Sequence, residues 1–416
     1  MNHQTDHNHF QVFEHCTLEG LSPKHQEALE IFHEKSKGLY YDLTRKGIKF
    51  KQFVGALRIG SLQIEVLPKA DKSSDDKAVW QGALIQMLRK VYGFEVKATS
   101  QANLKTQPNA VFDLYFELFI KEVEYLIHKG LIKKYRKEEG NQTALKGSLR
   151  FGQHLQKNLV HQERFFVRYT TYDRINPYNQ VLYKTLCVLQ KINTSPSLQS
   201  RICSLLLNFP EMPDLKVDEA FFEKLVLNRK TEGYRKAIQI SRLILLNYHP
   251  DLSKGRNDVL ALMFDMNDLW EKYVLVCLRK AGAEQKITVK GQAIKGFWKP
   301  MEGYLKTIRP DIVLEKNDQV IVVDTKWKRP EKGRPDDGDL KQLFVYNMYW
   351  KARQSYLLYP GSPDSVMGSY FHFEEQTEFH SECGQLWMTV LNSENRLDLS
   401  LGKNILEKID ESFKNY

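Results

Sequence analysis

The chain has 416 residues, long enough for two or more domains with separate cores. Its 61 Lys and Arg residues outnumber its 51 Asp and Glu residues, and the resulting net charge of +10 suits a polyanionic partner without specifying one. No stretch reaches the roughly 18 apolar residues needed to cross a bilayer, so no membrane-spanning helix is expected.

The five cysteines are scattered and form no Cys-x-x-Cys pair, so neither a zinc site nor a disulfide framework is indicated. The N-terminal residues are polar and lack the apolar core of a signal peptide. Both observations favour a reducing, cytoplasmic location. Neither a Walker A loop nor a Gly-x-Gly-x-x-Gly motif occurs, so we expect this chain to bind no nucleotide itself.

The first part of the chain predicts a small antiparallel β unit beside helices. Residues 23–37 predict a helix, with Ser22 as its N-cap. Residues 48–60 are strand-like, and residues 61–69 alternate so that one face carries Leu62, Ile64 and Val66. The dipeptide Gly60-Ser61 supplies the turn between the two runs.

Helices are predicted over residues 78–92 and 112–127, the second strongly apolar. The segment 130–150 is basic, and within it residues 133–137 place a tyrosine among cations. Such a run can contact nucleic acid, but a solvated charged loop is the favoured interpretation for so short a stretch. Residues 165–172 are strand-like.

A further helix starts at Asn176-Pro177, and residues 220–249 are mainly helical. The polar segment 249–255, which contains Pro, Ser and Gly, is the best candidate for a linker. We therefore predict two domains, with an N-terminal β and helical region over 1–250 and a C-terminal domain over 251–416.

The most informative stretch is a predicted β-hairpin formed by residues 307–314 and 320–326, both rich in Ile and Val. Asp311 opens the first strand, and Asp324 and Lys326 close the second on a shared face. Buried hairpins rarely carry ionisable groups without a reason, because desolvating an unpaired charge is costly. Two converging carboxylates can hold Mg²⁺, and a lysine beside them can position or deprotonate a water and stabilise charge on a phosphate.

On those three residues alone, a solvent-facing hairpin end is as good an interpretation as a catalytic site. The neighbouring segments favour the catalytic one. Glu271 lies in an amphipathic helix predicted over residues 266–274, and Gln342 and Tyr346 share one face of a helix that starts at Asp339. The order of helix Glu, Pro-Asp strand, Asp-x-Lys strand and Gln-x-x-x-Tyr helix resembles the PD-(D/E)xK nucleases.

Five runs of residues point to one family within these nucleases. They are residues 60–69, 145–147, 172–179, 309–311 and 324–328. In this order they resemble the McrC family, the nuclease subunits of McrBC modification-dependent restriction systems. The resemblance extends from about residue 48 to about residue 360, and its C-terminal motifs are the most specific.

This resemblance implies an α+β N-terminal region with a small β unit and helices, followed by an α/β PD-(D/E)xK restriction-endonuclease-like domain. It implies a Mg²⁺-dependent endonuclease of double-stranded DNA within a GTP-driven, 5-methylcytosine-specific complex. It further implies that the N-terminal region docks on a separate AAA+ GTPase ring of the McrB type and stimulates its hydrolysis. We assign no residues to that docking.

Carried over residue by residue, the resemblance makes Asp311 and Asp324 the Mg²⁺ ligands and Lys326 the catalytic lysine. Gln342 and Tyr346 would support the site or the DNA backbone.

Glu271 would complete the site, or it is an exposed helix glutamate paired with a nearby lysine. Trp327 either packs against DNA or belongs to the core. Contacts to phosphates, which position a duplex without reading its sequence, are expected from the basic side chains Lys328, Arg329, Lys332 and Arg334.

Two other classes of function stay open. One is a stand-alone nuclease in DNA repair or RNA processing, and the other is a non-catalytic DNA-binding adaptor with a vestigial nuclease fold. The complete set of Asp311, Asp324 and Lys326 argues against the adaptor. A neighbouring gene for an AAA+ GTPase would favour the restriction complex over the stand-alone nuclease.

Overall fold

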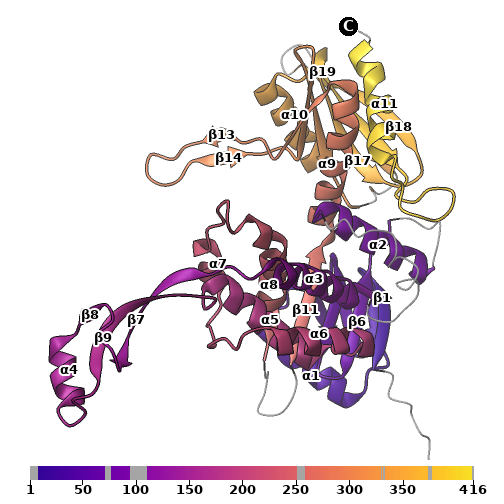
Figure 1. Ribbon diagram of the computed structural model, residues 1–416. Coiled ribbons are helices and arrows are strands. Elements are labelled where there is room, and N and C mark those ends of the chain that lie inside the picture. Colours follow the sequence, from indigo (N-terminus) through magenta and orange to yellow (C-terminus); the bar gives the residue numbers. More distant parts are fainter. Residues whose placement is uncertain are drawn as a thin grey trace, which may run out of the picture. The chain divides into compact units, whose positions relative to one another are not determined.

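The computed structural model describes residues 8–70, 76–93, 110–250, 258–328, 330, 333–372 and 377–414 (Figure 1). The chain divides into two compact units. The first combines Met1–Val111 with Met263–Tyr416, and the second consists of Phe112–Leu262. This grouping does not follow the boundary between residues 250 and 251, which stays a prediction. Most of the predicted linker lies outside the described residues.

The N-terminal part of the first unit contributes strands to two sheets. β1 (His9–Phe13) pairs in parallel with β6 (Leu62–Leu67), which pairs antiparallel with β5 (Phe53–Ile59). The second sheet has the order β2–β4–β3, with bounds Thr17–Glu19, Gly47–Phe50 and Tyr41–Thr44. Gly60 has a φ of 57° in the turn between β5 and β6, so the predicted antiparallel pairing is confirmed.

Two helices in this part begin at polar caps. Ser22 Oγ accepts a hydrogen bond from the N–H of His25 at the start of α1 (Pro23–Lys35), as the sequence predicts. Asp76 Oδ1 accepts one from the N–H of Ala78 at the start of α2 (Lys77–Val91). Each cap satisfies a backbone donor that has no partner within the helix.

Strand β6 departs from the alternation seen in its sequence, because all six of its residues are buried. Leu62, Ile64 and Val66 are buried as predicted, and so is Glu65, with 1% of its surface exposed. The Glu65 carboxylate accepts hydrogen bonds from Gln11 Nε2, Gln81 Nε2 and the N–H of Val111, at 2.9, 2.6 and 3.3 Å. These donors replace the water that a half-buried strand would keep on its polar face.

The C-terminal part of the first unit is built on a six-stranded sheet of order β12–β15–β16–β17–β19–β18. The bounds are Thr288–Gly291, Ile312–Lys316, Gln319–Thr325, Gln354–Pro360, Glu378–Met388 and Asp364–Phe371. The three strands β16, β17 and β19 run parallel, and the other pairs are antiparallel. The helices of this part are α9 (Met266–Gln285), α10 (Asp337–Trp350) and α11 (Leu401–Lys414).

The predicted central hairpin is confirmed as β15–β16, but its first strand is shorter than expected. The run 307–314 breaks at Pro310, which has no N–H to donate to a ladder. Residues before the break belong to β14 (Lys306–Ile308), which pairs with β13 (Lys295–Trp298) in a separate two-stranded sheet. Asp311 therefore lies in the short link between two hairpins.

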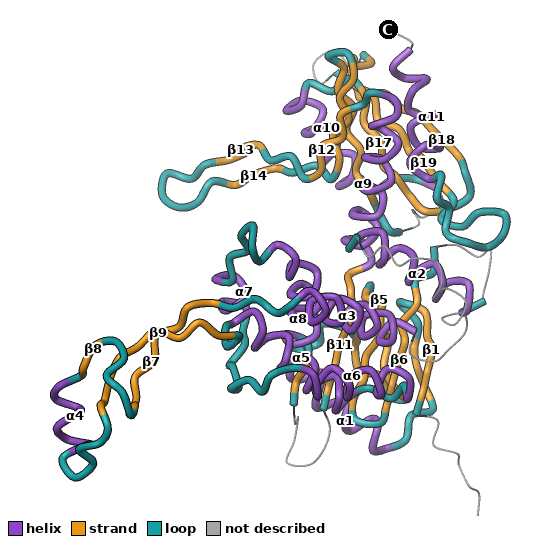
Figure 2. The backbone as a smooth tube through the Cα atoms, viewed as in Figure 1, coloured by secondary structure: helices purple, strands orange, loops and turns teal. Residues whose placement is uncertain are grey.

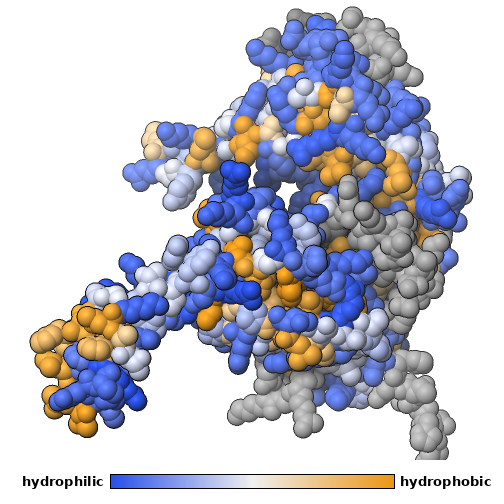
Figure 3. Space-filling view, viewed as in Figure 1, coloured by the Kyte–Doolittle hydropathy of each residue, from blue (hydrophilic) through white to orange (hydrophobic). Residues whose placement is uncertain are grey.

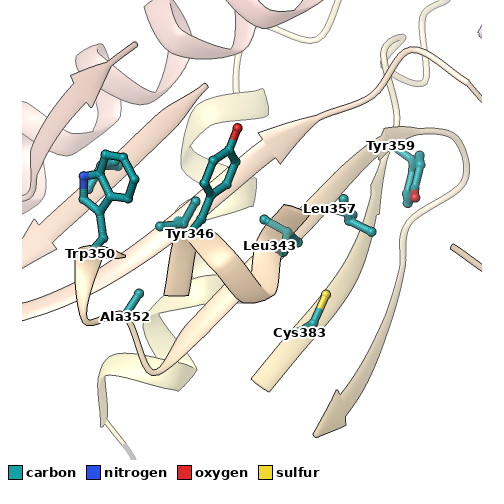
Figure 4. Close-up of a cluster of buried hydrophobic side chains, with 9 residues drawn as sticks. Leu343, Tyr346, Trp350, Ala352, Leu357, Tyr359 and Cys383 are labelled. Atoms are coloured by element: carbon teal, nitrogen blue, oxygen red, sulfur yellow. The ribbon is translucent and has the colours of Figure 1, made fainter. Parts of the chain in front are cut away.

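Helix α10 connects β16 to β17 and packs on the sheet through Leu343, Tyr346 and Trp350, which recur at helical spacing. Figure 4 shows these side chains directed toward residues of the strands. The cluster also contains Val313, Val322, Ala352, Leu357, Tyr359 and Cys383. This packing fixes the helix that carries Gln342 against the strand that carries Asp324.

The second unit is mainly helical. Its helices are α3 (Ala110–Lys129), α5 (Pro177–Ile192), α6 (Pro196–Asn208), α7 (Glu219–Lys224), η2 (Glu232–Tyr234) and α8 (Arg235–Leu246). The predicted start of α5 is confirmed, because Asn176 Oδ1 accepts a hydrogen bond from the N–H of Asn179. β10 (Tyr248–His249) pairs with β11 (Val259–Asp265), the strand in which the chain returns to the first unit.

A three-stranded β arm projects from the helices of the second unit (Figure 2). β7 (Lys134–Gln142) pairs antiparallel with β9 (Phe165–Asp173), and the arm also carries β8 (Ser148–Leu149) and α4 (Phe151–Asn158). The interpretation of the basic segment as a loop was therefore wrong about its conformation. Alternate β7 side chains are exposed and the others are half-buried, so the charged composition concealed a strand.

Apolar side chains gather at the end of this arm, where Figure 3 shows a hydrophobic surface. The apolar tip, as we call it, consists of the exposed residues Leu145, Leu149, Phe151, Leu155, Leu159 and Val160. A contiguous exposed patch of this kind marks a site of interaction with another molecule. Among the described residues, no helix combines the length and the apolarity required to cross a membrane.

Candidate active site

Asp311 is held in place by the strand opposite to it. The N–H and the hydroxyl of Thr325 both donate hydrogen bonds to Asp311 Oδ2, at 2.7 and 2.8 Å. Since Ile312 pairs with Val323 in the ladder, Asp311 and Asp324 are the next positions beyond that pair. The hairpin thus brings two carboxylates that are thirteen positions apart in the sequence to one end of the sheet.

Asp324 has only 2% of its surface exposed, and Lys326 Nζ lies 2.7 Å from its Oδ2. Burial raises the pKa of Asp324 to about 7, and the negative charge of Asp311 adds to this effect. The positive charge of Lys326 acts in the opposite direction. Acidic groups crowded in this way are relieved by a bound cation.

Lys326 is surrounded by acceptors. Besides Asp324, it lies 3.3 Å from Asp339 Oδ1 and donates to Gln342 Oε1 at 3.3 Å. Burial lowers the pKa of Lys326, but the charges of Asp324 and Asp339 outweigh burial and raise it above its usual value. The lysine is therefore a fixed positive charge and a poor base.

Gln342 and Tyr346 form a hydrogen-bonded row along one face of α10, as their spacing predicts. Gln342 Nε2 donates to Tyr346 Oη at 2.8 Å, and the Tyr346 hydroxyl donates to the carbonyl of Arg309 at 3.0 Å. The row runs from Lys326 to the backbone just before Asp311. These hydrogen bonds fix the position of the Lys326 side chain relative to the backbone of Arg309, two residues before Asp311.

Glu271 on α9 belongs to the same group of acidic residues. It is half-buried, accepts a hydrogen bond from Gln292 Nε2, and Gln292 in turn donates its N–H to the carbonyl of Asp311 at 2.9 Å. Burial raises the pKa of Glu271, and the negative charge of Asp311 raises it further. The nearby Lys272 pairs with Asp268 at 2.6 Å instead.

Comparison with known proteins identifies the family to which this chain belongs. Residues 48–360 match the profile of a family described as McrBC 5-methylcytosine restriction system component. The chain belongs to this family. The McrC resemblance seen in the sequence motifs is thereby confirmed.

Two solved structures of this family show the same fold. One is a half-complex from a tetradecameric assembly of Thermococcus gammatolerans McrB AAA+ hexamers with bound McrC. It is 18% identical, the match covers 96% of this chain and 99% of that chain, and the TM-score is 0.70. The other, the Thermococcus gammatolerans McrBC complex, is 18% identical with a TM-score of 0.50 and coverages of 65% and 87%. No curated protein matches the sequence. The predicted mixture of α and β structure is confirmed in this McrBC fold.

The structure adds Asp339 to the residues that the sequence singled out. Its side chain is 12% exposed and lies between Lys326 and Lys328, which is 2.7 Å from Asp339 Oδ2. An acidic residue in the first turn of a helix is common for electrostatic reasons, so the sequence could not mark Asp339 as part of the site. Thr325 and Gln292 were also missed, because neither residue is a defining position of a sequence motif.

The basic residues predicted to contact phosphates have different surroundings. Lys328 forms ion pairs with Asp336 and Asp339, and these pairs hold its side chain beside the site. Arg334 is exposed to solvent. Arg329 and Lys332 lie outside the described residues.

Trp327 belongs to the core, the second of the two roles considered for it. It is 7% exposed, its ring lies 5.3 Å from that of Trp270, and its Nε1–H donates to Glu14 Oε1 at 2.7 Å. Glu14 follows β1, so the residue after Lys326 is anchored on the N-terminal part of the same unit. Burial raises the pKa of Glu14 to about 7 despite this hydrogen bond.

The donor set fits Mg²⁺. The described residues contain no group of three or more His, Cys, Asp or Glu side chains placed to hold a metal ion. The site instead offers Asp311 and Asp324, which repel each other electrostatically. Mg²⁺ favours oxygen ligands and keeps several waters, so one or two carboxylates together with substrate phosphate oxygens suffice.

Proposed function

We propose that this chain is the Mg²⁺-dependent DNA endonuclease subunit of a GTP-driven, 5-methylcytosine-specific restriction complex. The observation that carries the proposal is the convergence of Asp311, Asp324 and Lys326 at the end of β15–β16. This arrangement agrees with a PD-(D/E)xK nuclease site. The restriction system is proposed because of family membership, and the nuclease reaction is proposed because of the site geometry.

Each residue has a role in this chemistry. Asp311 and Asp324 would hold Mg²⁺, and the ion would supply Lewis-acid activation of a phosphate and of a water. Lys326, kept protonated by its acidic neighbours, stabilises the charge that develops on the scissile phosphate. Gln342 and Tyr346 keep Lys326 in position, and Glu271 orients Gln292 beside Asp311.

Asp324→Asn tests this proposal, because it keeps the shape of the side chain and removes the charge that would bind the metal. We expect loss of Mg²⁺-dependent cleavage of a methylated duplex in the presence of the GTPase partner and GTP. Thermal stability without metal should not fall, since repulsion from Asp311 is removed. Asp364→Asn on the exposed edge strand β18 is the matched control. Cleavage by Asp324→Asn at the wild-type rate would exclude this site.

The second part of the proposal concerns the partner. The similar Thermococcus chain comes from an assembly of McrB AAA+ hexamers with bound McrC. We propose that this chain likewise docks on an AAA+ GTPase ring of the McrB type and stimulates GTP hydrolysis. The apolar tip of the β7–β9 arm is a surface of the second unit that suits such a protein partner.

Leu159→Asp with Val160→Asp tests the docking, because these side chains are 73% and 84% exposed and their replacement should not disturb folding. We expect loss of GTPase stimulation while the affinity for duplex DNA stays unchanged. Leu207→Asp is the control, since Leu207 is 88% exposed on α6 of the same unit. Full stimulation by the double variant would place the docking surface elsewhere.

A further inference from the structure

The β13–β14 hairpin is a second surface of the first unit that the nuclease chemistry leaves unused. Its strands, Lys295–Trp298 and Lys306–Ile308, form their own two-stranded sheet, which projects from the six-stranded sheet (Figure 1). Apolar side chains that would normally be buried are exposed along it. They are Ile294, Phe297, Trp298, Met301, Tyr304 and Leu305, with exposed fractions from 48% to 106%.

The charge of this hairpin is positive. Residues 294–309 contain four cations, Lys295, Lys299, Lys306 and Arg309, and one carboxylate, Glu302. In the part of the chain that the structure describes, Lys299 and Lys306 are exposed and have no ion-pair partner. Trp298 lies directly opposite Lys306 in the ladder, so an aromatic ring and a cation share one face. Exposed rings beside unpaired cations fit a nucleic acid better than a protein surface of mixed charge.

The base of the hairpin is tied to the active site in two ways. The chain passes from β14 through Arg309 and Pro310 directly to Asp311. In addition, Lys295 Nζ donates to the carbonyl of Tyr349 at 2.6 Å and lies 4.8 Å from the centre of the Trp350 ring. Helix α10, which carries Tyr349, also carries the row that holds Lys326. The hairpin is therefore positioned by the same helix as the catalytic lysine.

The length of the hairpin sets how far it can reach along a substrate. Tyr304 lies four positions before Ile308, which corresponds to about 13 Å of extended chain. The rise of duplex DNA is about 3.4 Å per base pair, so Tyr304 can reach about four base pairs from the base of the hairpin. A two-stranded ribbon is also of a size that the major groove, about 12 Å wide, admits.

We propose that the β13–β14 hairpin binds duplex DNA beside the cleavage site, with the ribbon in the major groove. Lys299 and Lys306 contact phosphates, and Trp298 and Tyr304 contact the sugars and base edges between them. The inference rests on the proposed nuclease function, because the duplex must lie against Asp311. The hairpin fixes the distance between the scissile phosphate and a contact about four base pairs away.

The first experiment measures binding of the full chain to a 30-base-pair duplex without Mg²⁺, over a series of salt concentrations. Each phosphate contact contributes a slope of about −0.9 in log K against log salt, so Lys299→Ala with Lys306→Ala should reduce the slope by about 2. Trp298→Ala should weaken binding and leave the slope unchanged. Lys403→Ala with Lys408→Ala on α11 removes the same charge from exposed positions and is the control.

The second experiment measures Mg²⁺-dependent cleavage by the same variants with the GTPase partner present. The hairpin variants should raise KM for DNA more than they lower kcat, and a footprint should lose protection about four base pairs from the cut. Equal affinity and equal slope for the hairpin and control variants would overturn the inference while wild-type cleavage still upheld the nuclease. Failure of the wild type to cleave would overturn the nuclease proposal, and the slopes would still decide the hairpin. If the wild type self-associates in solution and the hairpin variants do not, with unchanged DNA affinity, the hairpin makes contacts between copies of this chain and the proposal is refuted.

Discussion

Two hairpins follow each other in the first unit and differ in almost every property of their side chains. In β15–β16 the core residues are fully buried, with 0% of the surface exposed for each of Ile312, Val313, Leu314, Val322 and Val323. In β13–β14 nearly every residue is exposed. Pro310 separates the two. A hairpin buried on both faces holds charged groups at fixed positions, whereas an exposed one presents its side chains to another molecule.

The largest effect should come from the buried hairpin's catalytic end. Lys326→Ala should lower DNA cleavage by about 10³-fold or more, because a fixed positive charge at the developing phosphate charge is lost. Stimulation of the partner's GTPase should persist, since nothing in the role of Lys326 requires contact with the partner's nucleotide. Parallel assays of cleavage and GTP turnover check both. A well-folded variant that loses GTPase stimulation would contradict this separation of chemistry from docking.

The next effect concerns stability. Leu314→Ala should lower the free energy of unfolding by about 2–5 kcal/mol, because Leu314 is fully buried in β15 and its loss leaves a cavity. Val366→Ala on the edge strand β18, where Val366 is 50% exposed, should have a much smaller effect. Denaturant unfolding of both variants gives the comparison. Equal losses would mean that burial does not distinguish these strands.

The sequence was most informative where a pattern is local. The β15–β16 hairpin, the Ser22 cap and the Gln342–Tyr346 face each depend on residues a few positions apart. Periodicity could not show that Glu65 on β6 is buried, because the groups that donate hydrogen bonds to it come from other elements. The hydrogen bond between Glu14 and Trp327 joins residues 313 positions apart, so no local signal could reveal it.

The candidate site shows the same limit. Asp311, Asp324 and Lys326 were recognisable because the helix motifs before and after them follow an order that resembles the PD-(D/E)xK nucleases. Asp339 was hidden among the acidic residues common at helix starts. Strand β14 was merged with β15 in the predicted strand 307–314, since side-chain composition does not reveal where a proline ends a ladder. Strand β13 was not predicted from the sequence.

The burial of Glu14 predicts a pH dependence of stability. The folded protein has a Glu14 pKa of about 7 against an ordinary value of 4.5, so it keeps a proton that the unfolded chain releases. Stability from this group therefore falls as pH rises from about 4.5 to about 7 and stays low above that range. The ionisable neighbours are Asp265, which raises the pKa further, and His15, whose Nε2 lies 3.9 Å from the carboxylate.

Glu14→Gln keeps an oxygen that accepts from the Trp327 Nε1–H and from the N–H of Lys69, but it carries no charge. At pH 8 the variant should be more stable than the wild type by up to about 3 kcal/mol, and the difference should shrink toward pH 4.5. Thermal unfolding of both proteins across this range measures the difference. Parallel stability curves would show that Glu14 is not the titrating group.

The smallest effect on stability should come from the exposed hairpin, and it completes the comparison. Trp298 is 56% exposed, and its loss should remove little buried apolar surface. Trp298→Ala should therefore change the free energy of unfolding by no more than about 0.5 kcal/mol, although tryptophan in a core is among the most costly residues to truncate. The same variant should bind duplex DNA more weakly. An effect on DNA binding without an effect on stability would assign Trp298 to contact with a partner. A loss of stability similar to that of Leu314→Ala would instead show that β13–β14 is part of the core, and the contrast between the two hairpins would fail.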